Sequence, residues 1–462
     1  MEPQWFREGQ YIAVDRLEDL LGEDMITRLM AAGILTAARC DDTDFDGLPV
    51  DVPQVRSVKF SFCGTLLAGD VLIKCYPKYH TSEQAGRSAF PHVMAAIQKY
   101  DRSRRQRIYG AAAGESNGSI LPIVIALIED YCHNGLYQYN RQEMEINGPG
   151  ETDWQSTIDR HNPVMVNSRP VYMQMETYRT RNDLENFFRQ VHMAVLDECS
   201  DVIRRMDLGS MMPVQGIRFL ENKLDALGST EHILRRLRQE RASQFLAKRQ
   251  NTLRLLMMYL ERRHNSSSRA PIVFYGTTAM NMVWEKALAE VLDNQLDFRI
   301  GNIQALDEEA RRSFAGKDRT LMDYIEHPVW RLPGGGRFLA ETLRPDTVSI
   351  KDGEFIIYDA KYYVPSVKED SIAGQPGLDS VTKQYMYHMA YEGFLEYFHI
   401  GNAKNVFLIP HEPAEDGSVS WPMASVDFRL LSRHTGGVGV DCLYVDADAV
   451  WRAYADGQRM ML

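Results

Sequence analysis

A short hairpin pattern in the C-terminal third constrains this chain more than any other feature of its sequence. Asp352 and Gly353 form a turn dipeptide between two runs rich in β-branched and aromatic residues, which predicts a β-hairpin. The second run, Phe355–Tyr363, is otherwise apolar and aromatic, so it is predicted to be a central strand. Because side chains alternate along a strand, Asp359 and Lys361 share one face. Burying these charges without partners is costly, and the pattern therefore indicates a chemical role.

Two carboxylates near this hairpin suit hydrolysis of a phosphodiester bond. Asp346 and Asp359 could hold Mg²⁺, which prefers oxygen ligands, and the backbone carbonyl of Ala360 could supply a further one. The metal would polarise the scissile phosphate and lower the pKa of a bound water. Lys361 would orient that water and stabilise the negative charge that develops on the phosphate. The alternative is a solvated hairpin with an incidental ion pair, which the apolar flanks disfavour.

Predicted helices on both sides of the hairpin add two candidates. An apolar stripe runs along residues 278–293, and Glu285 lies at its edge, where a helical carboxylate can face a cleft. Gln384 lies on a downstream helix rich in Tyr, Met and Phe. The alternatives are a surface carboxylate and an ordinary helical amide. The predicted catalytic residues are therefore Asp346, Asp359, Lys361, Glu285 and Gln384.

The charge balance argues at first against a nucleic-acid enzyme. The chain has 462 residues with 52 Lys and Arg and 63 Asp and Glu, a formal net charge of −11, whereas phosphate binding needs a positive surface. The charge is uneven, however. Residues 231–264 contain nine Lys or Arg and three Glu, so they carry +6 and the rest of the chain −17. A solvated helical face is the general alternative. The residues predicted to contact DNA are Arg235, Arg236, Arg241, Lys248 and Arg249.

Cysteine usage and hydropathy indicate a reducing, cytoplasmic setting. Six cysteines are scattered without CxxC pairs, which predicts neither a disulfide framework nor a zinc ribbon. No apolar run approaches the ~20 residues that would span a bilayer, and the first residues lack the pattern of a signal peptide. The sequence contains no P-loop motif, so any dependence on GTP would come through a partner.

Length and periodicity predict about three domains. Residues 1–105 are expected to form an α+β region, residues 106–268 a mainly helical middle region with the basic helix, and residues 269–462 an α/β domain with a mixed central sheet.

Capping and turn residues place the elements of the first region. Asp15 is expected to cap a helix that ends at Gly33. Strands are predicted at Val58–Phe62 and Val71–Tyr76, joined by a turn that contains Gly69 and Asp70.

The hairpin residues resemble a known catalytic motif. Asp346 followed by Asp359-Ala360-Lys361 is similar to the motif of the PD-(D/E)xK nuclease superfamily, with Glu285 and Gln384 in the usual places of its accessory residues. The chain looks more closely like the LlaJI-type, McrC-like subunits of restriction systems, over nearly its whole length. The segments that carry this resemblance are Lys59-Phe60 through Tyr76–Tyr79, Glu129–Tyr131 with Asn134–Tyr137, Ile146–Trp154 with Thr157-Ile158, Tyr275–Thr277, Val283–Glu285, Pro328–Trp330, Asp359–Tyr363 and Thr382–Tyr385.

The resemblance implies more than the residues themselves. It implies a restriction-endonuclease-like fold for residues 269–462, a Mg²⁺-dependent reaction and double-stranded DNA as the substrate. Such subunits act with a McrB-like AAA+ GTPase hexamer, whose ring docks onto their N-terminal part, so residues 1–105 are the implied docking region. Two alternatives stay open: a non-catalytic adaptor that stimulates GTP hydrolysis by the AAA+ ring, and a nuclease that acts on RNA or single strands. The complete catalytic motif favours the DNA endonuclease.

Overall fold

The computed structural model describes residues 2–38, 56–108, 120–138, 140–182, 185–209, 218–219, 223–266, 272–314 and 316–462. These residues form two compact units. One unit combines residues 1–117 with residues 274–462, and the other comprises residues 118–273. The first and last of the three predicted regions thus share one unit, while the division into three domains stays a prediction. In the described part of the chain, no helix has both the length and the apolar character needed to cross a membrane.

Two small sheets form the N-terminal part of the first unit. One has the order β1-β6-β5-β12, and the other has the order β2-β4-β3. The strands of the first sheet are β1 (Gln4–Arg7), β6 (Val71–Tyr76), β5 (Cys63–Ala68) and β12 (Ile272–Thr277); those of the second are β2 (Tyr11–Ala13), β4 (Ser57–Phe60) and β3 (Leu35–Ala37). Gly69 lies in the turn between β5 and β6, which pair in antiparallel fashion. The predicted strand at 58–62 is therefore β4, and it pairs with β2 and β3 rather than with β6.

The first predicted helix is two helices. The chain forms α1 (Val14–Leu21) and α2 (Glu23–Ala31), and Gly22 between them has a φ of 81°, a conformation that glycine adopts readily. The prediction that Asp15 caps the helix is wrong, because the N-cap position is Ala13 and Asp15 lies in the first turn. An acidic residue there still interacts favourably with the helix dipole.

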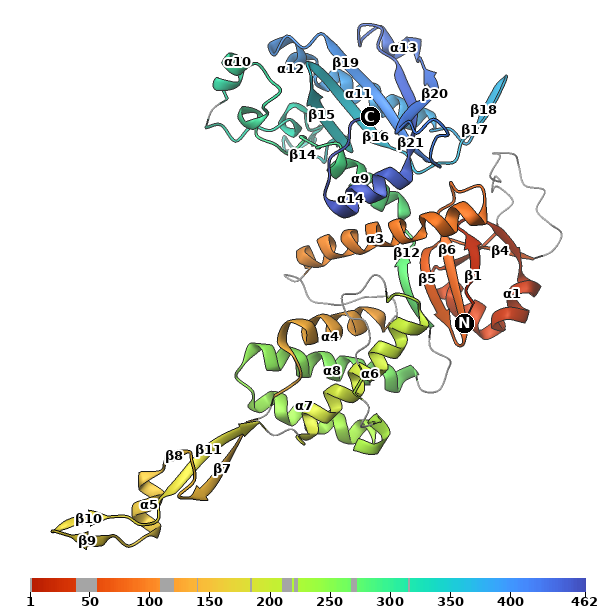
Figure 1. Cartoon of the computed structure of the whole chain (residues 1–462). Coiled ribbons are helices and arrows are strands. Elements are labelled where there is room, and N and C mark those ends of the chain that lie inside the picture. Colours follow the sequence, from red (N-terminus) through yellow and green to blue (C-terminus); the bar gives the residue numbers. More distant parts are fainter. Residues whose placement is uncertain are drawn as a thin grey trace. The chain divides into compact units, whose positions relative to one another are not determined.

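A five-stranded mixed sheet forms the C-terminal part of the same unit (Figure 1). Its order is β15-β16-β19-β21-β20, in which β16, β19 and β21 run parallel and the two outer strands are antiparallel to their neighbours. The strands are β15 (Thr347–Lys351), β16 (Glu354–Ala360), β19 (Asn402–His411), β21 (Val440–Asp446) and β20 (Ser420–Val426). The predicted mixed sheet is confirmed, and the strand with Asp359 is an internal one.

Helices cover this sheet and connect it to the N-terminal part. α11 (Leu378–Ala390) and α12 (Glu392–Tyr397) pack on the face that carries Phe355 and Ile357. α9 (Met280–Val291) and α14 (Ala447–Asp456) pack together, and the long α3 (Glu83–Ile108) contacts both. The unit also contains the short elements α10 (Glu308–Arg312), β13 (Val329–Arg331), β14 (Arg337–Leu339), β17 (Ser366–Lys368), β18 (Ser371–Ala373) and α13 (Arg429–Ser432).

The described residues of the second unit include four long helices, in a region that the sequence predicts to be mainly helical. They are α4 (Leu121–Asn134), α6 (Phe187–Arg205), α7 (Thr230–Ser243) and α8 (Ala247–Ser266). The buried carboxylate of Asp130 joins two of them, because it accepts a hydrogen bond of 2.6 Å from the Thr252 hydroxyl and one of 3.1 Å from the Asn251 amide.

An arm of residues 140–182 extends from these helices (Figure 1). These residues belong to the region that the sequence predicts to be mainly helical, and no strands are predicted here. The arm contains a three-stranded sheet and a hairpin made of β7 (Asn140–Ile146), β8 (Glu151–Thr152), β11 (Glu176–Asn182), β9 (Val164–Val166) and β10 (Arg169–Val171), together with α5 (Trp154–Arg160).

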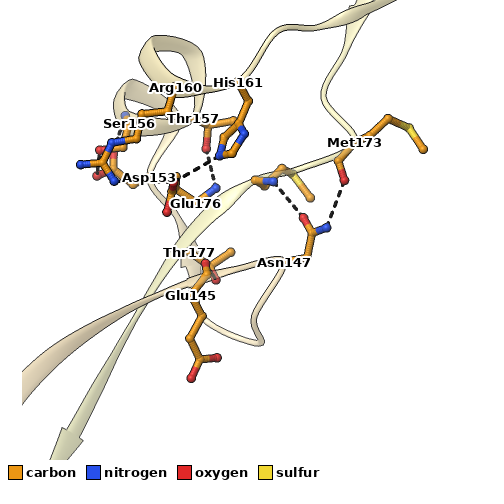
Figure 2. A network of polar contacts seen from close by, with 11 residues as sticks. Glu145, Asn147, Asp153, Ser156, Thr157, Arg160, His161, Met173, Glu176 and Thr177 are labelled. Carbon is orange, nitrogen blue, oxygen red and sulfur yellow. Dashed lines mark hydrogen bonds and ion pairs between the residues drawn. The ribbon is translucent and has the colours of Figure 1, made fainter.

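Polar contacts hold the arm together (Figure 2). The Asn147 side chain accepts a hydrogen bond of 2.8 Å from the backbone N–H of Met175 and donates one of 3.0 Å to the carbonyl of Met173. The buried Glu176 lies 3.2 Å from the Nε2 atom of His161, and its backbone N–H donates to the Thr157 hydroxyl at 2.9 Å. These contacts tie α5 and the loop at Asn147 to the start of β11.

Candidate active site

The hairpin predicted from Asp352 and Gly353 is the framework of the candidate site. Both turn residues have positive φ values, 51° and 81°, as a two-residue type I′ turn requires. β15 and β16 pair in antiparallel register from Thr347 opposite Tyr358 to Lys351 opposite Glu354. This register places the start of β15 beside the end of β16, where the candidate residues lie.

Asp346 immediately precedes β15 and is fixed from two sides. Its side-chain Oδ2 accepts a hydrogen bond of 2.8 Å from the backbone N–H of Ala360. Its backbone carbonyl accepts one of 3.0 Å from the side-chain amide of Asn294. The Asp346 carboxylate is therefore held against the end of β16.

Asp359 and Lys361 lie at that same end of β16. The Lys361 Nζ is 2.7 Å from the Asp359 Oδ2, and the two side chains are only 16% and 12% exposed. The backbone N–H of Lys361 donates to the carbonyl of Leu408 at 2.9 Å, which continues the pairing of β16 with β19. The ion pair is therefore largely shielded from solvent, and the pairing of β16 with β19 fixes the backbone that carries it.

The carboxylates of Asp346, Asp359 and Glu285 influence one another electrostatically at the end of β16. The pKa of Asp346 is raised to about 8 by burial, by its hydrogen bond to Asp359 and by the charges of Asp359 and Glu285. The pKa of Glu285 is also raised, first by partial burial and then by the charge of Asp359, while Lys361 opposes the shift. The structure thus brings Asp346, Asp359, Lys361 and Glu285 together.

Gln384 lies on α11, against the backbone of β16. Its Nε2 donates a hydrogen bond of 2.8 Å to the carbonyl of Ile357, two residues before Asp359. The side chain is fully buried, and its Oε1 has no hydrogen-bond partner among the described residues. In this arrangement Gln384 supports the strand, and its catalytic role stays a prediction.

Comparison with known families decides the wider relationship. A sequence model described as "LlaJI restriction endonuclease" matches residues 62–303 and 308–448, most of the chain. The chain belongs to the LlaJI restriction endonuclease family. The family relationship predicted from the sequence is therefore confirmed.

Individual relatives of this LlaJI-family chain are distant. The "Type II restriction enzyme BsuMI component YdjA" of Bacillus subtilis (strain 168) is 23% identical over 424 residues, which cover 86% of this chain and 81% of that protein. A chain in the refined half-complex of Thermococcus gammatolerans McrB AAA+ hexamers with bound McrC is 13% identical. That match covers 98% of this chain and 99% of the other with a TM-score of 0.39. A chain of the T. gammatolerans McrBC complex is 12% identical. That match covers 62% of this chain and 86% of the other, with a TM-score of 0.24.

The metal donors of the LlaJI-family chain are few. Within the described residues, no three side chains of His, Cys, Asp or Glu are grouped so that they could hold a metal ion. The predicted set consists of two carboxylates, Asp346 and Asp359, and the carbonyl of Ala360. Mg²⁺ keeps several waters and is commonly bound through one or two carboxylates, so this donor set fits Mg²⁺. The raised pKa of Asp346 supports the fit, since a divalent cation would replace the proton that the crowded carboxylates favour.

The predicted DNA-contacting residues lie in the other unit, on α7 and α8. The Arg236 guanidinium stacks 3.7 Å from the centroid of the Phe187 ring, and Arg235 lies 3.4 Å from the His232 ring. Arg241 and Lys248 are exposed, and Arg249 is partly exposed. Their role in DNA binding stays a prediction.

The sequence did not predict two residues that bind the backbone at or just before Asp346. Asn294 accepts hydrogen bonds of 3.1 Å from the backbone N–H groups of Val348 and Leu296, in addition to its bond with Asp346. The Tyr387 hydroxyl donates to the Arg344 carbonyl at 3.0 Å. Neither residue belongs to a motif, so no sequence signal marks them.

An open cavity of about 740 Å³ nearby is lined by Glu326, Glu341 and residues of α11, and the candidate catalytic residues are not part of its lining.

Proposed function

We propose that this chain is the Mg²⁺-dependent DNA endonuclease subunit of a restriction system and hydrolyses phosphodiester bonds in double-stranded DNA. The observation that carries the proposal is the enclosed group of Asp346, Asp359 and Lys361 at the ends of adjacent strands. Membership of the LlaJI restriction endonuclease family supports the same reaction class. A purely structural ion pair does not explain why a second and a third carboxylate approach Asp359.

Each residue of the candidate site has its own role in the proposed reaction. Asp346, Asp359 and the Ala360 carbonyl would hold Mg²⁺, which supplies Lewis-acid activation of the phosphate and of a bound water. The Lys361 ammonium, fixed beside Asp359, stabilises negative charge on the reacting phosphate and orients the attacking water. Glu285 stays accessible at the edge of the site, and its raised pKa makes it a better proton acceptor than an ordinary glutamate.

We also propose that the chain acts with a McrB-like AAA+ GTPase. The support is the sequence resemblance to McrC-like subunits over nearly the whole length, together with the lack of a P-loop motif in this chain. The partner would bind and hydrolyse GTP, and residues 1–105 are the proposed docking region.

Cleavage of duplex DNA by matched variants tests the proposal. Asp359→Ala should abolish Mg²⁺-dependent cleavage in the presence of the partner GTPase and GTP. Asp352→Asn removes a carboxylate from the turn of the same hairpin and should cleave like the wild type, because Asn also tolerates the left-handed conformation. Full cleavage by Asp359→Ala would refute the assignment. No cleavage by the wild type with any divalent metal, with faster GTP hydrolysis by the partner, would identify an adaptor instead.

A further inference from the structure

The β13–β14 hairpin of the first unit exposes all of its side chains. Residues 329–339 are exposed throughout, and the strands pair in antiparallel register. The turn is tight, since the Gly335 N–H donates to the Leu332 carbonyl at 2.9 Å and the Leu332 N–H to the Gly336 carbonyl at 2.8 Å. The hairpin is therefore an ordered ribbon rather than a loose loop.

One face of this ribbon carries two arginines directly opposite each other. Arg331 pairs with Arg337 in the register. Like charges at directly opposed positions of an antiparallel pair are destabilising. The structure shows no ion pair of either guanidinium with a described residue, although other exposed arginines of this unit, such as Arg312 and Arg299, have acidic partners. An anion bound between the two guanidinium groups would remove the repulsion.

The opposite face of the ribbon is apolar and aromatic. Trp330 and Phe338 are also directly opposed, with nearly parallel rings (7°) whose centroids are 6.2 Å apart. Their side chains are 60% and 51% exposed. Leu332 extends the same face and is also exposed. An arginine pair on one face and an aromatic pair on the other suit a ligand that is anionic and also presents apolar groups, as duplex DNA does with its phosphates and with the thymine methyl groups of its major groove.

The chain connects this ribbon directly to the candidate active site. Only six residues separate Leu339, the end of β14, from Asp346, so the two lie within roughly 25 Å of each other. That span is shorter than one turn of duplex DNA, about 34 Å. The Ala340 N–H donates to the Pro328 carbonyl at 2.9 Å and closes the base of the ribbon. A duplex with its scissile phosphate at Asp346 can therefore reach the ribbon within the same helical turn.

We infer that the β13–β14 hairpin binds the DNA duplex beside the cleavage site. Arg331 and Arg337 contact backbone phosphates, and the face of Trp330 and Phe338 contacts the bases. The major groove is about 12 Å wide and admits a two-stranded ribbon of this kind. The inference rests on the proposed nuclease function for the position of the substrate, but it assigns DNA binding to a different element from the basic helices α7 and α8.

Binding of a fluorescein-labelled DNA duplex, measured by anisotropy as a function of NaCl concentration, tests the inference. The full-length chain carries Asp359→Asn in every sample so that the duplex stays uncut. The double variant Arg331→Ala/Arg337→Ala should bind more weakly, and the slope of log K against log salt should become shallower by about 1.8, because two phosphate contacts are lost. Arg429→Ala/Arg433→Ala, which removes two exposed arginines at α13, is the matched control and should keep the wild-type slope.

A second pair of variants separates the aromatic contact from the charge. Trp330→Ala should weaken binding about tenfold without changing the salt slope, because it removes an apolar contact with the base edges and no phosphate contact, and Trp330→Tyr should restore most of the affinity. An unchanged slope for the arginine double variant overturns the inference, even if that variant binds the GTPase partner less well. Because this assay needs no cleavage, its outcome is independent of the nuclease proposal. A chain that never cuts DNA can still show the shallower slope, and a cutting enzyme can lack it.

Discussion

The end of β16 and the arm of residues 140–182 differ in how their polar groups are arranged. At the end of β16, carboxylates crowd together in an enclosed place, and Asp346 has a pKa raised to about 8 because its neighbours are also acidic. In the arm, Asn147, Glu176 and His161 form hydrogen bonds and an ion pair with other residues of the arm (Figure 2). The arm also exposes large apolar side chains, which include Trp154, Met165 and Met173.

This difference distinguishes the candidate catalytic site from a surface that exposes apolar side chains. Crowded, partly buried carboxylates disfavour their own charged forms, and a cation relieves that cost. Exposed apolar side chains leave no polar group without a hydrogen bond. A contiguous group of such side chains is typical of an interaction surface. The predictions below test whether the two regions respond differently to the same kinds of substitution.

The largest expected effect is on the chemistry of the first region. Asp346→Asn keeps the shape and the hydrogen bond from the Ala360 N–H but removes a metal-binding charge. We expect DNA cleavage to fall by about 10³-fold, the loss that follows from removing one transition-state contact. The thermal midpoint should not fall, since the substitution also removes carboxylate repulsion. A variant that unfolds at a lower temperature would show that Asp346 is structural.

The second prediction concerns pH. In the metal-free protein the Asp346 carboxyl, which faces Asp359, Glu285 and Lys361, has a pKa of about 8, compared with about 4 in an unfolded chain. The folded state then holds a proton that the unfolded state has lost. The free energy of unfolding should therefore decrease as pH rises from about 4 to 8, with a slope of at most about 1.4 kcal/mol per unit.

Denaturant titrations at several pH values, with EDTA and with Mg²⁺, measure this slope. Mg²⁺ should stabilise the protein more at higher pH, because the carboxylates must lose their proton to bind it. The Asp346→Asn variant should lose both the slope and the Mg²⁺ effect. A wild-type stability that is equally dependent on pH with and without Mg²⁺ would argue against a metal at these carboxylates.

A smaller effect is expected for the residue that positions Asp346. Asn294→Ala removes side-chain hydrogen bonds to the Asp346 carbonyl and the Val348 N–H, which should lower the free energy of unfolding by about 2 kcal/mol. Displacement of the carboxylate should reduce cleavage roughly tenfold or more. Asn302→Ala, at an exposed asparagine of the same unit, is the control. Wild-type cleavage by Asn294→Ala would mean that the strand pairing alone fixes Asp346.

The smallest effect is expected in the arm. Asn147→Gly keeps the positive φ of 54° accessible but removes both side-chain hydrogen bonds. It should cost about 1–2 kcal/mol, confined to the arm. Hydrogen exchange at the Met175 amide should speed up, while exchange at Ala360 stays the same. Faster exchange in both places would show that the two regions are not energetically separate.

What the sequence predicted and what it missed follow from the range of the interactions. The β15–β16 hairpin could be predicted because its turn is local, and alternation along one strand placed Asp359 and Lys361 together. The arm could not, because β7 pairs with β11 across about thirty intervening residues and neither strand has a strong apolar alternation. The split between α1 and α2 depends on one backbone angle at Gly22, and Asn294 acts through side-chain bonds that no residue pattern encodes.

The most direct measurement of the central claim is the rate of Mg²⁺-dependent cleavage of duplex DNA by Lys361→Ala and Lys351→Ala, each assembled with the partner GTPase and GTP. Both variants lose one lysine from the same hairpin, but only Lys361 pairs with the buried Asp359. The account predicts that Lys351→Ala cleaves at the wild-type rate and that Lys361→Ala does not cleave. Equal cleavage by the two variants would contradict it.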